Sequence, residues 1–275
     1  MRGWWQDLSD LVLPAECAGC GRSRTALCAR CSAALRGVAP SRVRPRPEPP
    51  GLPVVHGAAP YRNAVRAVLL AHKERGALGL ARPLGEALAR AVRAGIGSGG
   101  GGQDGGGDRA PDGPPGPVTL VPVPSAPRAV RARGHDPTRR IAYAAAAELR
   151  RAGVPARVLA VLRQRREVAD QSGLDARERL VNVTGALEVV GGGRGLLAGS
   201  GRIVLVDDLM TTGASLAEAA RAIAAAVGSG KSGGEHTSGR TRFVADPGMA
   251  DEIHEITFRA AVVAASPDSF EINRN

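Results

Sequence analysis

The residues with the clearest capacity for chemistry lie in the run IVLVDDLMTTGAS at positions 203–215. Four apolar residues, 203–206, form a buried-strand pattern that leads directly into Asp207 and Asp208. A Thr-Thr-Gly turn follows and precedes an alanine-rich helical segment. Backbone N–H groups and hydroxyls then converge at a helix N-terminus, which suits a phosphate monoester. The two carboxylates can accept hydrogen bonds from vicinal hydroxyls, and they would lie close to Mg²⁺ carried by a diphosphate.

A diol site beside a phosphate site predicts a sugar phosphate as the ligand. A ribose 5-phosphate unit fits, with its 2- and 3-hydroxyls on Asp207 and Asp208 and its 5-phosphate in the loop at 211–215. An Asp-Asp turn that only caps the following helix would explain single residues, but not the order of apolar strand, acidic pair and turn. The predicted phosphate loop consists of Thr211, Thr212, Gly213, Ala214 and Ser215.

A second chemical cluster is formed by the four cysteines Cys17, Cys20, Cys28 and Cys31, which are spaced C-x2-C-x7-C-x2-C. Two such pairs can hold Zn²⁺ in tetrahedral coordination. Four thiolates complete the coordination shell, so the predicted zinc is structural and the segment a small knuckle. Two redox-active dithiols are the alternative.

The composition limits the class of protein without choosing a function. The chain has 275 residues, 43% of them hydrophobic, which is enough to bury a sizeable core. Its 37 basic residues exceed the 26 acidic ones, and all of the basic residues except Lys73 and Lys231 are arginines. This surplus indicates either a polyanion-binding surface or a compositional habit of the source genome.

No apolar run reaches the roughly 18 residues that a membrane span needs, and Asp7 and Asp10 lie where a signal peptide would be apolar. We therefore expect a cytoplasmic protein without membrane insertion. Disulfides are rare in that compartment, which favours metal ligands or reduced thiols at the four cysteines.

Composition shifts divide the chain into three parts. We expect the zinc knuckle at 1–40, a stiff linker rich in proline and arginine at 41–52, and one larger domain at 53–275. Within that domain, glycine and proline dominate 95–117, which we expect to be a disordered insertion. The glycine-rich segment 191–201 is expected to be a surface loop.

The larger domain alternates between the apolar periods of helices and strands. This order predicts an α/β fold with a mostly parallel sheet flanked by helices. Ligands bind beyond the C-terminal ends of the strands in such sheets. The expected helices are 62–75, 77–94, 138–151 and 214–227, and the expected strands are 118–123, 157–162, 185–190, 203–206 and 256–265.

The run at 203–215 closely resembles the loop of type I phosphoribosyltransferases that binds 5-phosphoribosyl 1-diphosphate (PRPP). The chain further resembles one branch of that superfamily, the ComF-like phosphoribosyltransferase proteins associated with DNA uptake and competence. The resemblance covers nearly the whole chain outside 95–117, and residues 264–275 look like the end of actinobacterial members. The resembling segments are the four-cysteine knuckle, the segment around Lys73, Val121-Pro122-Val123-Pro124 followed by Arg133-Gly134, and residues 171–182.

The resemblance implies a type I phosphoribosyltransferase fold and transfer of a phosphoribosyl group from PRPP to an acceptor that the sequence does not reveal. In that reaction diphosphate leaves C1 of the ribose while a nitrogen nucleophile meets an oxocarbenium-like centre, and Mg²⁺ stabilises the departing diphosphate. Arg177 and Arg179 lie in the segment that corresponds to the family's mobile catalytic loop, and Arg177 is expected to close over the diphosphate. Lys73 and Arg133 are the other catalytic candidates.

Two functions of different classes remain open. The chain is either such an enzyme or a non-catalytic module, in which the loop senses PRPP or another sugar phosphate. In the second case the arginine-rich surface and the knuckle would engage single-stranded DNA or a DNA-uptake helicase. A homodimer is expected from the family alone. The chain departs from the family at His135 and Asp136, because an aromatic residue and Asn usually follow the Arg-Gly pair there.

Overall fold

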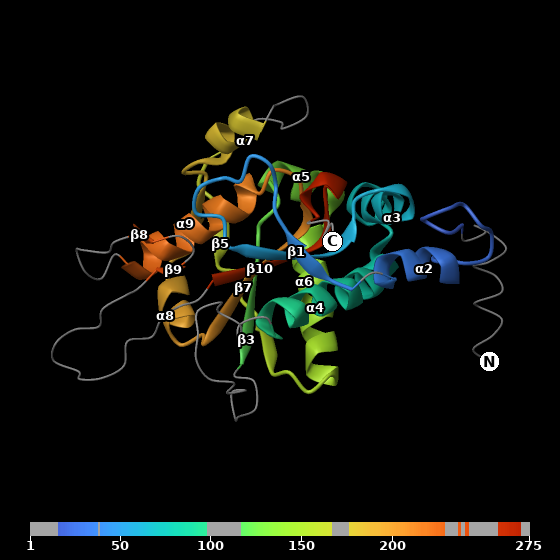
Figure 1. Ribbon diagram of the computed structural model, residues 1–275, viewed down its shortest axis with the longest axis horizontal. Helices are drawn as coiled ribbons and strands as arrows, with labels where there is room; N and C mark the ends of the chain where they lie inside the picture. Colours follow the sequence, from blue (N-terminus) through green and yellow to red (C-terminus); the bar gives the residue numbers. More distant parts are fainter. Residues whose placement is uncertain are drawn as a thin grey trace, which may run out of the picture.

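The computed structural model has a central sheet surrounded by helices (Figure 1). Of the expected glycine-rich insertion, residues 95–97 end a helix and residue 117 precedes a strand, while 98–116 lie outside the described residues. Residues 1–15 of the expected knuckle also lie outside them. The described residues are 16–37, 39–97, 117–166, 176–228, 236–237, 240–241 and 258–270, without the side chains of Ala176, Arg177, Arg179, 236–237 and 240–241.

A six-stranded sheet with the strand order β1-β2-β10-β7-β3-β4 forms the centre of the molecule. β1 runs antiparallel to β2, whereas the other neighbouring pairs are parallel. The mostly parallel sheet expected from the sequence is thus confirmed. The strands are β1 (Ser41–Val43), β2 (Val54–Pro60), β3 (Val118–Pro122), β4 (Ala156–Val158), β7 (Arg202–Met210) and β10 (Phe258–Ala265).

The expected helices are present with shifted ends. Residues 62–75, 138–151 and 214–227 correspond to α3, α6 and α9, and residues 77–94 divide into a short 3-10 helix and α4. In the described part of the chain, no helix combines the length and the apolar character that a membrane span requires. The helices are α2 (Ala29–Arg36), α3 (Asn63–Glu74), α4 (Ala81–Gly97), α5 (Pro127–Arg133), α6 (Pro137–Arg151), α7 (Ala176–Val183), α8 (Gly193–Ala198) and α9 (Ala214–Gly228), with 3-10 helices at Leu78–Leu80 and Pro267–Ser269.

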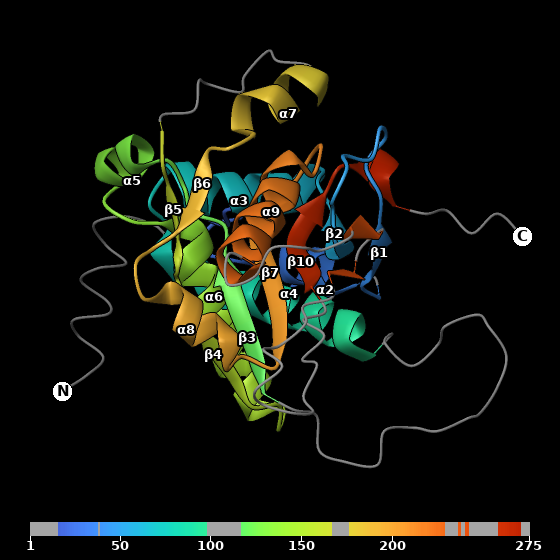
Figure 2. The same cartoon turned by 90° about the vertical axis from the view of Figure 1, so that its left-hand side faces the viewer.

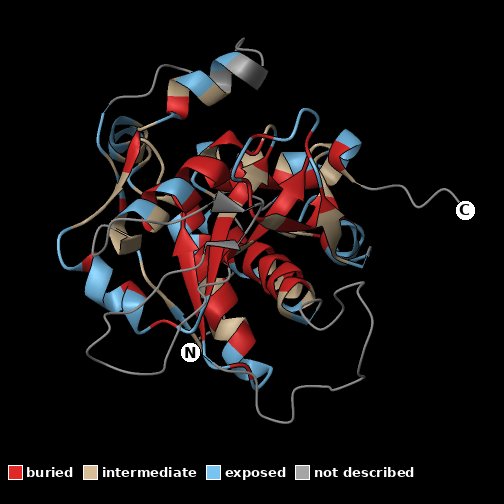
Figure 3. Ribbon diagram, turned by 60° about the vertical axis from the view of Figure 1, so that its left-hand side comes forward, coloured by how far each residue is buried: buried red, intermediate tan, exposed pale blue. Residues whose placement is uncertain are grey.

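Helices cover both faces of the sheet, as the side view in Figure 2 shows. Successive side chains of β7 point to opposite faces, because a strand has a period of two residues. Val204 and Val206 pack in a hydrophobic cluster with residues of α3, α4 and α6, whereas Ile203 and Leu205 pack in a second cluster with residues of α9. The buried residues of the sheet and its flanking helices form the interior in Figure 3. β7 is therefore buried on both faces, which explains its continuous apolar start.

α4 and α6 pack closely against each other over the sheet. A Cβ placed on Gly85 of α4 would lie 2.5 Å from the Cβ of Ala144 and 2.8 Å from the backbone nitrogen of Ala145, both in α6. Real Cβ atoms are not found at such short distances. Some of the contacting atoms belong to the backbone of α6, which cannot rotate away as a flexible side chain can. Only glycine therefore allows this helix pair to approach so closely.

Gly85→Ala is expected to destabilise the protein by about 1–3 kcal/mol, because the added methyl group forces α4 away from α6. Because alanine has a higher helix propensity than glycine, helix propensity alone would make Gly85→Ala stabilising. The sign of the change in unfolding free energy therefore tests the packing directly. Urea unfolding curves measure it. Gly97→Ala is the matched control, since a Cβ at this exposed end of α4 meets nothing within 4 Å; equal effects of both substitutions would contradict the close approach.

A small hairpin lies beside the main sheet and departs from the expected strand order. β5 (Leu162–Gln164) pairs antiparallel with β6 (Leu187–Val189). The single strand expected at 157–162 is therefore wrong, because the chain leaves the main sheet after β4 and enters the hairpin. The strand expected at 185–190 exists as β6 but does not join the parallel sheet. α7, which contains Arg177, lies between the two hairpin strands in the sequence.

The hairpin is fastened to α9 by a buried carboxylate. Glu218 is 4% exposed, and its Oε1 accepts a hydrogen bond of 3.0 Å from the backbone nitrogen of Leu187 in β6. The guanidinium of Arg221 donates to both oxygens of Glu218 at 2.6 and 2.8 Å. Burial alone would raise the pKa of Glu218, but hydrogen bonds from Arg221 and from backbone N–H groups of Leu187 and Gly185 lower it below its usual value.

Glu218→Ala is expected to cost about 1–3 kcal/mol of stability, because it leaves the N–H of Leu187 buried without its acceptor. Chemical denaturation measures the loss. Glu188→Ala is the control on the same hairpin: its ion pair with Arg163 joins two partly exposed side chains and should contribute under about 1 kcal/mol. A loss no greater for Glu218→Ala than for the control would show that the carboxylate does not fasten the hairpin.

The same carboxylate gives stability a pH dependence of known sign. Because the pKa of Glu218 is lowered in the folded protein, its contribution is present above the pKa of the unfolded state. That contribution is lost as the pH falls through the folded-state pKa. The difference in stability between the wild type and Glu218→Gln should therefore shrink in acid.

Two segments expected to be irregular contain regular structure. Residues 41–52, expected to be a linker, begin with β1, which pairs with β2 at the edge of the sheet. The glycine-rich segment 191–201 contains the helix α8, whose Leu197 is buried. In both cases pairing or packing with distant residues outweighs a local composition that favours loops.

Candidate functional site

The acidic pair lies on the central strand β7 of the sheet. Asp207 aligns with Val262 of β10, and the ladder continues to Met210, which aligns with Ala265. The expectation that the strand ends at Val206 is therefore wrong: the neighbouring strand β10 continues, and backbone pairing carries β7 past both carboxylates. The carboxylates nevertheless lie in the C-terminal half of a parallel strand, where ligand sites of such sheets are found.

Lys73, near the C-terminus of α3, forms an ion pair with this acidic pair. Its Nζ lies 2.9 Å from Oδ2 of Asp208, a residue that is only 5% exposed. Burial alone would lower the pKa of Lys73, but the charges of Asp208 and Asp207 raise it above its usual value. The candidate Lys73 is thus brought together with the predicted diol-binding residues and keeps its positive charge.

Asp207 makes a different set of contacts. Its Oδ1 accepts a hydrogen bond of 2.8 Å from the backbone nitrogen of Asp208, and the hydroxyl of Thr138 donates to the same oxygen at 3.4 Å. Although Asp207 keeps some contact with solvent, burial among surrounding atoms raises its pKa well above the usual value, and the neighbouring charge of Asp208 raises it further. Thr138, which was not among the expected site residues, lies in the first turn of α6.

The predicted phosphate loop follows β7 and leads into α9. Gly213 has a φ of +77°, a conformation that favours glycine. A Cβ there would lie 3.1 Å from both terminal methyl groups of Leu52 and 3.3 Å from Cγ of Pro45. Thr211 is exposed and Thr212 is half-buried. Ala214 is the first residue of α9 and Ser215 the second, so the turn and the helix N-terminus occur where the sequence predicts them.

Arg133 lies near this region but is engaged with Glu74. Its Nε and Nη2 each donate to a different oxygen of Glu74 at 2.8 Å, which joins α5 to the end of α3. His135 follows, and its Nε2 lies 3.2 Å from the backbone oxygen of His72. The guanidinium of Arg133 is therefore bound to Glu74, the residue next to Lys73 in α3, and not to the acidic pair.

Asp136, one of the two departures from the resembling family, has a structural role. It is the N-cap of α6 and accepts a hydrogen bond of 3.0 Å from the backbone nitrogen of Arg139. Its other oxygen accepts from the backbone nitrogen of Ser125 at 3.4 Å. Asp136 therefore fixes the start of the helix that presents Thr138 to Asp207. For Arg177, the structure gives the backbone position in α7, while its side chain lies outside the described residues.

The four cysteines come together at the N-terminal side of the molecule. Their sulfur atoms all lie within 4.8 Å of one another, a geometry that could hold a metal ion. Cys28 is the N-cap of α2, and its backbone nitrogen donates to Sγ of Cys17 at 3.3 Å. A Cβ on Gly19 would lie 2.7 Å from Sγ of Cys31. The chain therefore wraps tightly around the sulfur atoms, and amide-to-sulfur hydrogen bonds are typical of thiolate ligands.

The thiols of this cluster differ in acidity. Burial works against ionisation of Cys17, but hydrogen bonds from the backbone N–H groups of Cys28, Gly19 and Cys20 lower its pKa to about 6. For Cys31, burial together with the neighbouring thiols raises the pKa to about 12. Four thiolates so close together repel one another, and a divalent cation is the group that would allow all of them to ionise.

Comparison with known proteins does not identify a family. No protein-family model matches the chain, and no curated protein sequence matches it. The resemblance to ComF-like phosphoribosyltransferases therefore stays a prediction from the sequence. The functional argument depends on the acidic pair, its lysine and the turn at the start of α9.

Proposed function

We propose that the protein is a phosphoribosyltransferase of the type I fold, similar to the ComF-like proteins, and that it binds PRPP together with Mg²⁺. The observation that carries this proposal is the order of three features along one segment. Two carboxylates lie late in the central parallel strand, a glycine turn with φ of +77° follows, and a helix then begins. In this proposal the carboxylates bind the ribose diol and the turn binds the 5-phosphate of the same ribose 5-phosphate unit.

The residues of the site divide the task. The carboxylates of Asp207 and Asp208 accept the 2- and 3-hydroxyls of the ribose, and the backbone N–H groups and hydroxyls of 211–215 bind the 5-phosphate. The positive charge of Lys73, which is paired with Asp208, reduces the repulsion between the acidic pair and an anionic ligand. Mg²⁺ bound by the diphosphate would supply charge neutralisation for the leaving group.

The transfer step breaks the bond between C1 of the ribose and a diphosphate oxygen, and forms a bond between C1 and a nitrogen of the acceptor. The diphosphate leaves with the electron pair of the broken bond, and the acceptor nitrogen loses its proton to solvent or to the departing diphosphate. The protein's contribution is to position the ribose and to stabilise negative charge on the leaving group. Arg177 and Arg133, besides Lys73, are the proposed sources of the positive charge that stabilises the leaving diphosphate.

We further propose that the cysteine cluster holds one structural Zn²⁺. The distance of at most 4.8 Å between any two sulfur atoms fits four ligands around one ion, and the amide hydrogen bond to Cys17 favours its thiolate. With four thiolates no coordination position is left for a substrate. The zinc would therefore fold the segment 16–37 rather than take part in transfer.

Release of diphosphate from PRPP in the presence of a panel of nucleobases and amines tests the enzymatic function. We expect release with at least one acceptor and none without protein. If PRPP binds but no acceptor supports diphosphate release, the result favours a non-catalytic module that senses PRPP over an enzyme. In that case, binding of a single-stranded oligonucleotide that weakens with increasing salt would favour an adaptor for DNA or for a helicase. Failure of both measurements would contradict the proposal.

A further inference from the structure

One oxygen of the Asp207 carboxylate is occupied by donors of the protein itself. Oδ1 accepts a hydrogen bond of 2.8 Å from the backbone nitrogen of Asp208, and the hydroxyl of Thr138 donates to the same oxygen at 3.4 Å. A carboxylate oxygen has about two lone-pair sites, so these two donors fill the acceptor capacity of Oδ1. The capacity that Asp207 keeps for a ligand is therefore on its other oxygen, Oδ2.

The two donors restrain the carboxylate in different ways. The N–H of Asp208 belongs to the next residue of the same strand. Thr138 comes from α6, 69 positions away in the chain, and is only 3% exposed. The torsion that turns a carboxylate about its Cβ–Cγ bond has a broad energy minimum. A donor from a separate element is therefore what fixes the carboxylate of Asp207 relative to the rest of the site.

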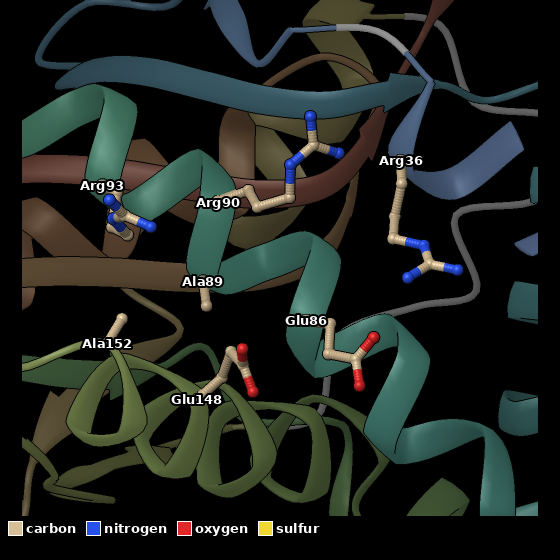
Figure 4. Close-up of a pocket in the computed structure, with 7 residues that line it drawn as sticks. All are labelled: Arg36, Glu86, Ala89, Arg90, Arg93, Glu148 and Ala152. Carbon is tan, nitrogen blue, oxygen red and sulfur yellow. The ribbon is translucent and has the colours of Figure 1, made fainter. Parts of the chain in front are cut away.

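The part of α6 that carries Thr138 is closely packed. The contact of Gly85 in α4 with Ala144 lies six residues after Thr138. A cavity of about 160 Å³ lies farther along α6, where Figure 4 shows Ala89 of α4 and Glu148 of α6 among its lining residues. Thr138 is thus on the side of the contact away from the cavity, and its hydroxyl has a firm support.

The two carboxylates of the acidic pair differ in access. Asp208 is 5% exposed, and its Oδ2 is held by Nζ of Lys73 at 2.9 Å. Asp207 is less deeply buried and keeps contact with solvent. Its contact with Thr138 is to a neutral hydroxyl, which leaves its charge uncompensated by that partner. Asp207 is therefore the more accessible acceptor of the pair.

We propose that Thr138 is a positioning residue for the ligand of the acidic pair: its hydroxyl holds the Asp207 carboxylate so that Oδ2 accepts a hydroxyl of the ribose. This inference rests on the proposed binding of PRPP. Thr138 acts through Asp207, because it orders the acceptor before the ligand arrives and so reduces the conformational freedom that is lost on binding. Its hydroxyl also stabilises the ionised carboxylate, which is the form that accepts hydrogen bonds at both oxygens.

Titration of the Asp207 carboxyl group, followed by carbon-13 NMR, tests the contact without any ligand. Thr138→Val keeps the shape of the side chain but removes the donor, so the pKa of Asp207 should rise still further above its usual value. Thr138→Ser keeps a hydroxyl and should restore the wild-type pKa. The charges of Asp208 and Lys73, which also act on Asp207, are present in every variant. Asp207→Asn assigns the signal by its loss.

Calorimetric titration with PRPP and Mg²⁺ tests the effect on the ligand. We expect Thr138→Val to weaken binding about three- to tenfold, the range of one hydrogen bond, and Thr138→Ser to restore most of the affinity. Thr119→Val is the matched control, because it removes a buried hydroxyl from β3 at a residue aligned with Ile203, four residues before Asp207. The control should bind PRPP as the wild type does, and thermal melting establishes that each variant is folded.

The outcomes separate this inference from the proposed function. A wild type that does not bind PRPP refutes the proposed function and the ribose contact with it, while the titration of Asp207 still decides whether Thr138 orders the carboxylate. If the wild type binds PRPP and Thr138→Val matches it in affinity and in the pKa of Asp207, the positioning role is overturned. Equal weakening in Thr138→Val and Thr138→Ser would also overturn it, because the hydroxyl would then not be the group that matters.

Discussion

Replacing Asp207 and Asp208 together by asparagine is expected to weaken the binding of PRPP with Mg²⁺ at least about 100-fold. A hydrogen bond to a charged group contributes about 1.5–3 kcal/mol, two such bonds are lost, and each 1.4 kcal/mol is a factor of ten in affinity. The asparagine side chains have nearly the same shape as the aspartates, so we expect both substitutions to keep the fold. The double variant should therefore lose affinity for PRPP without a loss of thermal stability of comparable size.

Calorimetric titration of the wild type and the double variant measures this difference. Glu188→Gln/Asp268→Asn is the matched control, because it removes two carboxylates from the partly exposed hairpin and from an exposed 3-10 helix. The control should bind PRPP as the wild type does. An unchanged affinity of the Asp207/Asp208 variant would refute the assignment of the diol site.

The raised pKa of Asp207 adds a pH dependence with a defined sign. Burial and the charge of Asp208 raise that pKa, so the protonated form persists to higher pH than in an ordinary aspartate. Ribose hydroxyls donate to the ionised carboxylate, so binding favours ionisation and releases a proton. Affinity should rise with pH through the pKa of Asp207, and calorimetry in buffers of different ionisation enthalpy measures the released proton. In Asp207→Asn the release should disappear; a release of the same size in that variant would show that another group titrates.

Removal of zinc is expected to produce the second large effect, the unfolding of the cysteine-containing segment. Structural zinc binds small peptides with an apparent free energy of about 10–16 kcal/mol at pH 7, and this energy is the folding energy of such segments. The buried hydrophobic residues of the segment are Cys17, Cys28, Cys31 and Leu35, so three of these four side chains are themselves proposed zinc ligands. A core this small does not hold the segment together without the ion.

Metal analysis should find about one zinc ion per chain in the wild type and none in Cys28→Ser. Hydrogen exchange should show loss of protection over 16–37 in that variant, while β7 and its neighbours stay protected. Ala29→Ser is the control, because it adds a hydroxyl at an exposed position of α2 and leaves the four thiols in place. A wild type that is free of metal, fully folded and reversibly oxidised would contradict the zinc site and support two redox dithiols.

The elements that could be predicted from the sequence are those whose own residues show the apolar period of a strand or a helix. The strand at 203–206 and the helix at 214–227 have apolar patterns of the right period, and they appear as β7 and α9. β2 was not predicted, because VVHGAAP contains histidine, glycine and proline, which do not favour strands. Its position is set by parallel pairing with β10, about 200 residues later in the chain. Strand pairing between residues so far apart in the chain leaves no pattern in the local sequence that could predict it.

The candidate site shows the same division. Asp207, Asp208 and the loop at 211–215 are consecutive in the chain, so strand, turn and helix could be predicted from one segment. The contact between Lys73 and Asp208 joins residues that are 135 positions apart, and only the resemblance drew attention to Lys73. Thr138 had no signal at all, since its contact with Asp207 depends on where α6 begins. That start is fixed by the cap formed by Asp136.

The most direct test of the central claim is a calorimetric titration of the wild-type protein with PRPP in the presence of Mg²⁺. The acidic pair, its lysine and the glycine turn predict saturable binding at one site per chain, with a Kd in about the micromolar range. No saturable binding at millimolar PRPP would contradict the account, because nothing in the acidic pair or the turn would then distinguish this strand from an ordinary one.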